Sequence, residues 1–312
     1  MISLRYQKND LIENTYYAQI IKNRSKAYIS DINKKCNDYL SMSFKDVVCA
    51  SPQRIYELQK GLKSRGDFRK IQNKFKCIHS TGKQNDYLVD TLYKKMPIEA
   101  KQIVYKQAGL RVCPYCNRSF IEKLKVNTRK GVKKIVGTWQ LDHFYSKVKF
   151  PMFAVSLYNL IPVCGSCNYI KGDADFKINP YLMDKTQEIT FEYDILGIDY
   201  LNDESQLKVK IKSSSNKALH DVNCLKLEEL YNGHRDIVQE IIKKTRYYGP
   251  EYMMSILNEM DTLFEDKDEL YRMLYGGYRN PDEFGKRPLS KFIKEIYEET
   301  VKDIEGFDYF SD

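Results

Sequence analysis

The chain has 312 residues, of which 30% are charged and 42% hydrophobic, a composition typical of a globular protein of one or two domains. No run approaches the ~18 apolar residues of a membrane span, and residues 1–10 lack the apolar core of a signal peptide. We therefore expect a cytoplasmic protein with no membrane partner. Lysine and arginine number 51 against 42 for aspartate and glutamate, which favours a polyanionic partner but also fits a lysine-rich composition.

The segment before residue 109 is expected to be helical. Apolar residues recur every three or four positions through residues 11–40, 53–64 and 97–109. Basic residues are frequent between positions 60 and 76, where the solvated face of amphipathic helices explains them more simply than a nucleic-acid groove. We take residues 1–108 as a helical N-terminal region that docks a partner or binds substrate.

The pattern changes from helical to mixed at residue 109. Residues 119–126 and 135–144 alternate like strands on either side of a polar, basic segment, which predicts a hairpin with a basic tip. Residues 164–171 are typical of a short helix that Gly172 ends. We take residues 109–182 as the central domain.

The remaining residues, 183–312, are expected to form a β-hairpin followed by helices. Residues 187–195 and 206–213 have the pattern of its two strands. A helical pattern returns at residues 225–248, and Pro288 marks the start of a last helix.

Two Cys-x-x-Cys pairs, Cys113/Cys116 and Cys164/Cys167, stand at either end of the central domain. Disulfides are rare in a reducing compartment, so closely spaced cysteines indicate metal ligands. Each pair can chelate from one turn, and the two pairs supply the four thiolates of a tetrahedral structural zinc site. A redox pair would normally occur once, before a helix of a βαβ unit. We therefore expect zinc to staple residues 109–182.

Polar residues between and beside the cysteines are candidates for chemistry, because a zinc ion with four thiolates has no open coordination position. Asp142 offers a carboxylate and Asn168 an amide oxygen, both suited to a hard cation such as Mg²⁺. His143 has the side chain best suited to accept a proton near neutral pH. Neighbouring residues of a strand face opposite ways, so Asp142 and His143 can serve one site only where the strand ends or bulges.

Two basic residues are candidate contacts for a substrate phosphate. Lys171 lies three residues after Asn168, on a neighbouring part of the same helix face. Arg118 follows the first cysteine pair. Both side chains can equally cap helices or lie in solvent.

The order of these residues resembles the ββα-metal site of the zinc-containing HNH endonucleases: Cys-x-x-Cys, Asp-His, Asn, then Cys-x-x-Cys-Asn-x-x-Lys. The resemblance implies that His143 is the general base and that Asp142 and Asn168 hold a catalytic Mg²⁺ or Mn²⁺ ion. It also implies that Asn159 braces the loop that carries the histidine. In the family, the last metal ligand is often a histidine, where this chain has Asn168, as other active members also do.

Within that family, the segments CPYCNR, QLDHFYSK and SLYNLIPVCGSCNYIKGD are most similar to the PtuB-like nucleases of Septu and retron anti-phage systems. The similarity covers residues 111–181. It implies an ABC-type ATPase as protein partner and a role in antiviral defence. Ser146 stands where relatives often have proline, which affects the turn after His143 but removes no ligand.

The sequence thus predicts an α+β fold, predominantly helical, with a central zinc-stapled ββα-metal (HNH) motif and a small additional hairpin. The expected function is hydrolysis of phosphodiester bonds in DNA or RNA, with structural zinc and catalytic Mg²⁺ or Mn²⁺. One alternative is a partner-dependent, toxin-like nuclease that is silent alone and uses its helical flanks as docking surface. The other is a zinc-stabilised nucleic-acid-binding or adaptor protein without catalysis. That alternative explains the cysteines and the charge but leaves Asp142, His143 and Asn168 as coincidence.

Overall fold

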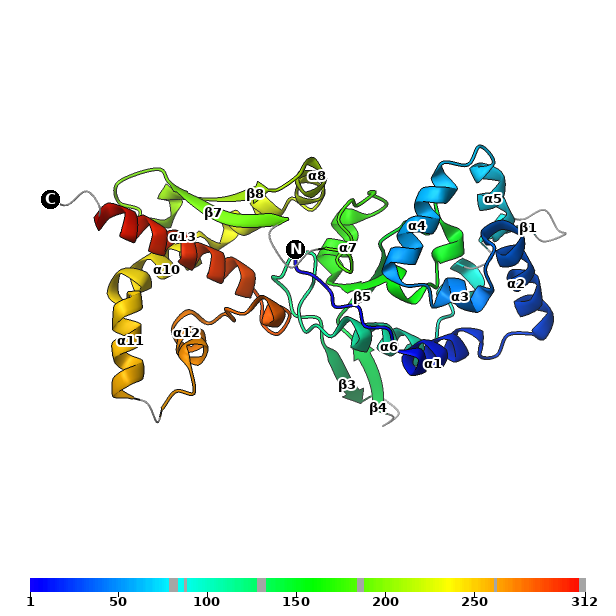
Figure 1. The fold of residues 1–312 in the computed structure, drawn as a ribbon, viewed down its shortest axis with the longest axis horizontal. Coiled ribbons are helices and arrows are strands. Elements are labelled where there is room, and N and C mark those ends of the chain that lie inside the picture. Colours follow the sequence, from blue (N-terminus) through cyan, green and yellow to red (C-terminus); the bar gives the residue numbers. More distant parts are fainter. Residues whose placement is uncertain (79–83, 87–88, 128–132, 184–187, 261–262, 309–312) are drawn as a thin grey trace. The chain divides into compact units, whose positions relative to one another are not determined.

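The computed structural model describes residues 1–78, 84–86, 89–127, 133–183, 188–260 and 263–308. Its fold is α+β, with predominant helices and small two-stranded antiparallel sheets (Figure 1), which confirms the expected α+β class and the predominance of helices. Within the described residues, no helix is both long enough and apolar enough to cross a membrane.

The chain forms two compact units. Unit 1 comprises Met1–Ser3, Arg111–Ile121 and Met183–Asp312, and unit 2 comprises Leu4–Leu110 and Glu122–Leu182. Most of the helical segment before residue 109 and the segment with Asp142 and His143 therefore belong to one unit.

Unit 2 opens with helices, as the apolar periodicity predicts. They are α1 (Asp10–Ile21), α2 (Lys26–Leu40), α3 (Phe44–Val48), α4 (Pro52–Lys63), α5 (Phe68–Phe75) and α6 (Ile98–Ala108), with a π-helical turn at Val89–Tyr93. Ser25, Ser43 and Ser51 cap α2, α3 and α4, because each side chain accepts a hydrogen bond from an amide of the first turn. Gly109 ends α6 in the left-handed conformation.

Among the described residues, the strands of unit 2 form three antiparallel pairs. These are β1 (Lys76–Ile78) with β2 (Gln84–Asp86), β3 (Lys123–Asn127) with β4 (Lys133–Gly137), and β5 (Gln140–His143) with β6 (Leu160–Val163). The β3–β4 pair confirms the expected hairpin, whose tip, residues 128–132, lies outside the described residues. The run at 135–144, however, is two strands with different partners, because Thr138 and Trp139 interrupt it.

The base of the β3–β4 hairpin explains why the run is interrupted between β4 and β5. This hairpin is called the ribbon below, and its base at residues 137–139 is called the ribbon root. The Trp139 ring is buried and stacks on Tyr105 of α6, with ring centroids 4.3 Å apart and planes 13° from parallel. A Cβ atom on Gly137 would lie 2.2 Å from the Trp139 ring, so the close approach of ring and backbone requires glycine. Beyond this root, every side chain of β3 is exposed, and Lys123 and Lys125 lie on one face of the ribbon.

Unit 1 is built on the hairpin of β7 (Ile189–Ile195) and β8 (Leu207–Ser213), as expected. Its helices are α8 (Asn216–Cys224), α9 (Leu227–Tyr231), α10 (Arg235–Tyr247), α11 (Pro250–Glu259), α12 (Lys267–Tyr275) and α13 (Ser290–Asp308). Along β8, apolar side chains are buried and the lysines between them are exposed. α13 packs against β7 and α10 (Figure 1). The helical pattern at 225–248 divides into α9 and α10 at a turn, Asn232–His234.

Candidate metal sites and catalytic pocket

The first cysteine pair lies on a tight knuckle. An isolated bridge joins Val112 to Phe120, and the Cys113 amide donates to the Ser119 carbonyl at 2.9 Å. Asn117 adopts the left-handed conformation (φ 51°), which asparagine tolerates better than most residues. This turn lets the Arg118 amide donate to the Cys116 sulfur at 3.4 Å.

The second pair opens a helix. Cys164 is the N-cap of α7 (Gly165–Lys171), and its sulfur accepts a hydrogen bond from the Cys167 amide at 3.4 Å. Amide donors on sulfur at both pairs stabilise the thiolate form that metal binding requires. α7 ends at Gly172 with φ 49°, as the sequence predicts.

The four cysteines form one buried cluster. The Sγ atoms of Cys113, Cys116, Cys164 and Cys167 all lie within 4.8 Å of one another. Zn–S bonds of ~2.3 Å place tetrahedral thiolates about 3.8 Å apart, so the cluster has the dimensions of such a site. The expected ligand set is therefore confirmed as a cluster that can hold a zinc ion.

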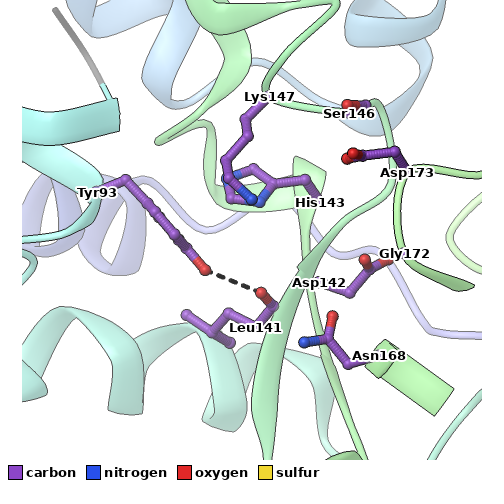
Figure 2. Close-up of a pocket in the computed structure, with 9 residues that line it drawn as sticks. All are labelled: Tyr93, Leu141, Asp142, His143, Ser146, Lys147, Asn168, Gly172 and Asp173. Atoms are coloured by element: carbon purple, nitrogen blue, oxygen red, sulfur yellow. Dashed lines mark hydrogen bonds between the residues drawn. The ribbon is translucent and has the colours of Figure 1, made fainter. Parts of the chain in front are cut away.

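The ββα arrangement of β5, β6 and α7 forms a separate pocket. β5 pairs with β6 along its whole length, and α7 packs on β5. Asp142 and His143 are the last two residues of β5, which meets the condition that the strand end there. The pocket has a volume of about 220 Å³ (Figure 2) and is lined by Tyr93, Leu141, Asp142, His143, Ser146, Lys147, Asn168, Gly172 and Asp173.

His143 is almost fully buried in the wall of this pocket. Its Nε2 atom lies 2.9 Å from the Ala154 carbonyl oxygen. A carbonyl oxygen only accepts, so Nε2 carries the proton and Nδ1 keeps its lone pair. Burial, with help from the Lys147 ammonium, lowers the pKa of His143 to about 3, so the imidazole is neutral at physiological pH.

Tyr93 holds the histidine from the other side. The two rings meet edge to face with centroids 4.3 Å apart, and the Tyr93 hydroxyl donates to the Leu141 carbonyl at 2.9 Å. Burial and the nearby Asp142 carboxylate raise the pKa of the Tyr93 hydroxyl to about 12, so it stays a donor. Tyr93 therefore fixes both the His143 ring and the strand that carries it.

Asn159 ties together the loop that follows His143. Its Oδ1 accepts from the Tyr145 amide at 2.9 Å, and its Nδ2 donates to the Tyr145 and Phe153 carbonyls at 3.1 and 3.0 Å. Its own carbonyl accepts from the Phe144 amide at 2.9 Å. The side chain is thus committed to the backbone and positions the histidine loop.

Lys171 lies in the protein interior rather than facing a phosphate. Its Nζ is 3.0 Å from Oδ1 of Asp142 and donates to the His143 carbonyl at 3.1 Å. The side chains of Lys171 and Asp142 are only 1% and 5% exposed, respectively. Lys171, which was expected to contact a phosphate, instead forms a buried ion pair that fixes the Asp142 carboxylate.

Asn168 offers its amide oxygen to the pocket. Its Nδ2 donates to Oε1 of Gln140 at 2.6 Å, and this oxygen can only accept. The bond turns Oδ1 of Asn168 toward Asp142, as Figure 2 shows. Asp142, His143 and Asn168 thus line one pocket.

No family model, curated protein or solved structure matches the chain.

Arg118, the other candidate for phosphate binding, lies in unit 1. Its Nε donates to Nε2 of His234 at 2.9 Å, and its guanidinium lies 5.9 Å from the centre of the Tyr231 ring. It is not among the residues that line the pocket. Its contact with substrate stays a prediction.

Three ionisable residues of the pocket were not expected from the sequence: Tyr93, Lys147 and Asp173. Lys147 lies four residues after His143 and Asp173 five after Asn168, so proximity to the motif could have indicated both. Tyr93 precedes the motif by about 50 residues, and no local pattern connects it to His143.

Proposed function

We propose that this protein is a metal-dependent HNH-type endonuclease that hydrolyses phosphodiester bonds in nucleic acid. The observation that carries the proposal is the shared pocket of Asp142, His143 and Asn168 on a ββα arrangement. A neutral imidazole beside two oxygen donors is the set of groups that metal-assisted hydrolysis requires.

The oxygen donors of the pocket fit a hard divalent cation. The Asp142 carboxylate, which Lys171 holds in place, lines the pocket and would supply an oxygen ligand. Asn168 would supply its amide oxygen, since its NH₂ group is committed to Gln140. When bound, Mg²⁺ or Mn²⁺ would offset negative charge on the phosphate and on the leaving oxygen.

His143 would act as the general base. Its Nδ1 lone pair can accept a proton from the attacking water, and the Ala154 carbonyl at Nε2 stabilises the resulting imidazolium. Tyr93 and Asn159 position it, the first through ring contact and the second through the loop backbone.

The cysteine cluster would hold zinc in a purely structural role. Resemblance of the motifs extends the proposal to an ABC-type ATPase partner and to antiviral defence. A zinc-stabilised binding or adaptor protein is the competing function, and it requires no catalysis at the pocket.

Cleavage assays with the full chain test the proposal. Plasmid DNA and tRNA are incubated with zinc-loaded protein in the presence and absence of Mg²⁺ or Mn²⁺, with and without the candidate ATPase. We expect cation-dependent cleavage that His143→Ala reduces by ~10²–10⁴-fold, the usual contribution of a general base. His220→Ala is the matched control, because His220 lies on α8 outside the pocket.

The outcomes separate the two functions. Cleavage that depends on the cation and on His143, with zinc content unchanged in the variant, supports the endonuclease. Equal cleavage by wild type and His143→Ala removes the histidine from the mechanism. Nucleic-acid binding without cleavage under every condition favours the adaptor.

A further inference from the structure

Three lysines from separate segments of unit 2 converge on one carboxylate. Lys63 ends α4, Lys149 lies in the loop after β5, and Lys177 follows α7. Their Nζ atoms lie 3.5, 3.7 and 3.6 Å from the same oxygen, Oδ2 of Asp175. These four residues are called the Asp175 cluster below.

The Asp175 cluster has surplus positive charge. Its three ammonium groups meet one carboxylate and, because all touch one oxygen, no two can be more than about 7 Å apart, so they repel one another. Burial alone would raise the pKa of Asp175, but the lysines outweigh it and hold that pKa below its ordinary value. The carboxylate is therefore ionised, and the cluster carries a net charge of about +2 at neutral pH.

The lysine side chains remain accessible. They are 46%, 48% and 39% exposed for Lys63, Lys149 and Lys177, so a further anion can reach them from solvent. Lysine binds phosphate as a mobile point charge and does not need the fixed geometry of arginine. A surface that gathers three lysines and neutralises only one has the charge that a polyanion requires.

The cluster lies next to the pocket. Lys147 and Asp173 line the pocket, and Lys149 and Asp175 each follow one of them by two residues. Two residues of chain span at most ~7 Å, so two separate connections keep the cluster close to the pocket rim.

We propose that the Asp175 cluster binds a backbone phosphate of the nucleic acid, adjacent to the phosphodiester in the pocket. This inference rests on the proposed function, because it assigns the cluster to the same substrate. Asp175 holds the three lysines together in the free protein and competes with the phosphate for them. Removing the carboxylate should therefore strengthen binding, whereas removing a lysine should weaken it.

Binding measurements that do not depend on cleavage test this proposal. Full-length His143→Ala protein is titrated into labelled duplex DNA, single-stranded DNA and single-stranded RNA without added divalent cation, and anisotropy is followed across a salt series. For the ligand that is bound, adding Lys149→Gln or Lys177→Gln, each alone, should weaken binding and reduce the salt slope by about one for a lost phosphate contact. Adding Asp175→Asn should tighten binding.

The lysine variants and Asp175→Asn are expected to change affinity in opposite directions, and this distinguishes a phosphate-binding cluster from one that only stabilises the fold. If the cluster only stabilised the fold, both kinds of change would lower Tm, and binding would follow the loss of folded protein. Lys34→Gln, an exposed lysine on α2, is the charge-matched control and should leave the salt slope nearly unchanged.

Failure of the inference can be told from failure of the proposed function. Unchanged affinity and salt slope in the Asp175 cluster variants, measured with folded protein, overturns the cluster as a phosphate site even if the wild type cuts. Opposite shifts in binding without any cleavage by wild type support the cluster and count against the endonuclease. The DNA and RNA arms identify which backbone is bound.

Discussion

The buried ion pair between Lys171 and Asp142 gives a direct test of how the pocket is held together. Lys171→Met keeps an unbranched stem against the Phe176 ring, which lies 5.1 Å from Nζ, but removes the ammonium group. The Asp142 carboxylate and the His143 carbonyl each lose the bond to Nζ. The perturbation therefore removes a charge partner with little change in packing.

The expected cost follows from burial. The two side chains are 1% and 5% exposed, so solvent cannot replace the lost partner. Leaving one member of a buried pair alone typically costs ~3–5 kcal/mol. For a protein of 312 residues, each kcal/mol lowers Tm by roughly 1.5 °C, which predicts a decrease of about 5–8 °C.

Calorimetry of wild type, Lys171→Met, Asp142→Leu and the double variant measures this cost as a cycle. The double variant should lose less stability than the two single changes together, because neither charge is left alone. Lys8→Met is the control, since Lys8 and Asp10 form an exposed pair worth at most about 1 kcal/mol. A Lys171→Met protein whose free energy of unfolding lies within about 1 kcal/mol of the wild-type value would refute this account of the pocket.

Two further predictions concern the cysteine cluster and the ribbon root. Cys167→Ser should lower zinc content and stability together, because a structural zinc site binds its ion with ~10–16 kcal/mol; full zinc content with an unchanged Tm would contradict it. Gly137→Ala should push the Trp139 ring off Tyr105 and cost ~1–3 kcal/mol, whereas Gly61→Ala on α4, where nothing lies within 4 Å, should be neutral or stabilising. Trp139 is the only tryptophan, so its fluorescence reports the displacement, and an unshifted spectrum would count against it.

Local patterns predicted the features that local chemistry determines. The Cys-x-x-Cys spacing, the short helix ended by Gly172 and the alternation of β7 and β8 each depend on residues close in the chain. The strand end at His143 meets the condition under which Asp142 and His143 can share one pocket, although no local pattern required the strand to end there.

Tertiary packing decided what the sequence did not predict. Lys171 has helical spacing suited to a solvent-facing phosphate contact, but Asp142 draws it into the interior. The strand-like run at 135–144 is interrupted because the Trp139 ring finds Tyr105 on a distant helix. Tyr93 reaches His143 in the same way, through a contact between segments that share no local pattern.

The short connection between β4 and β5 has a mechanical consequence. Only Thr138 and Trp139 separate the two strands, Thr138 is bonded to Glu122 at the other side of the ribbon, and Trp139 is wedged against α6. The exposed ribbon and the strand with Asp142 and His143 thus lack a hinge between them. A ligand that bends the β3–β4 hairpin would therefore move β5 as well, and with it the Asp142 carboxylate and the His143 imidazole.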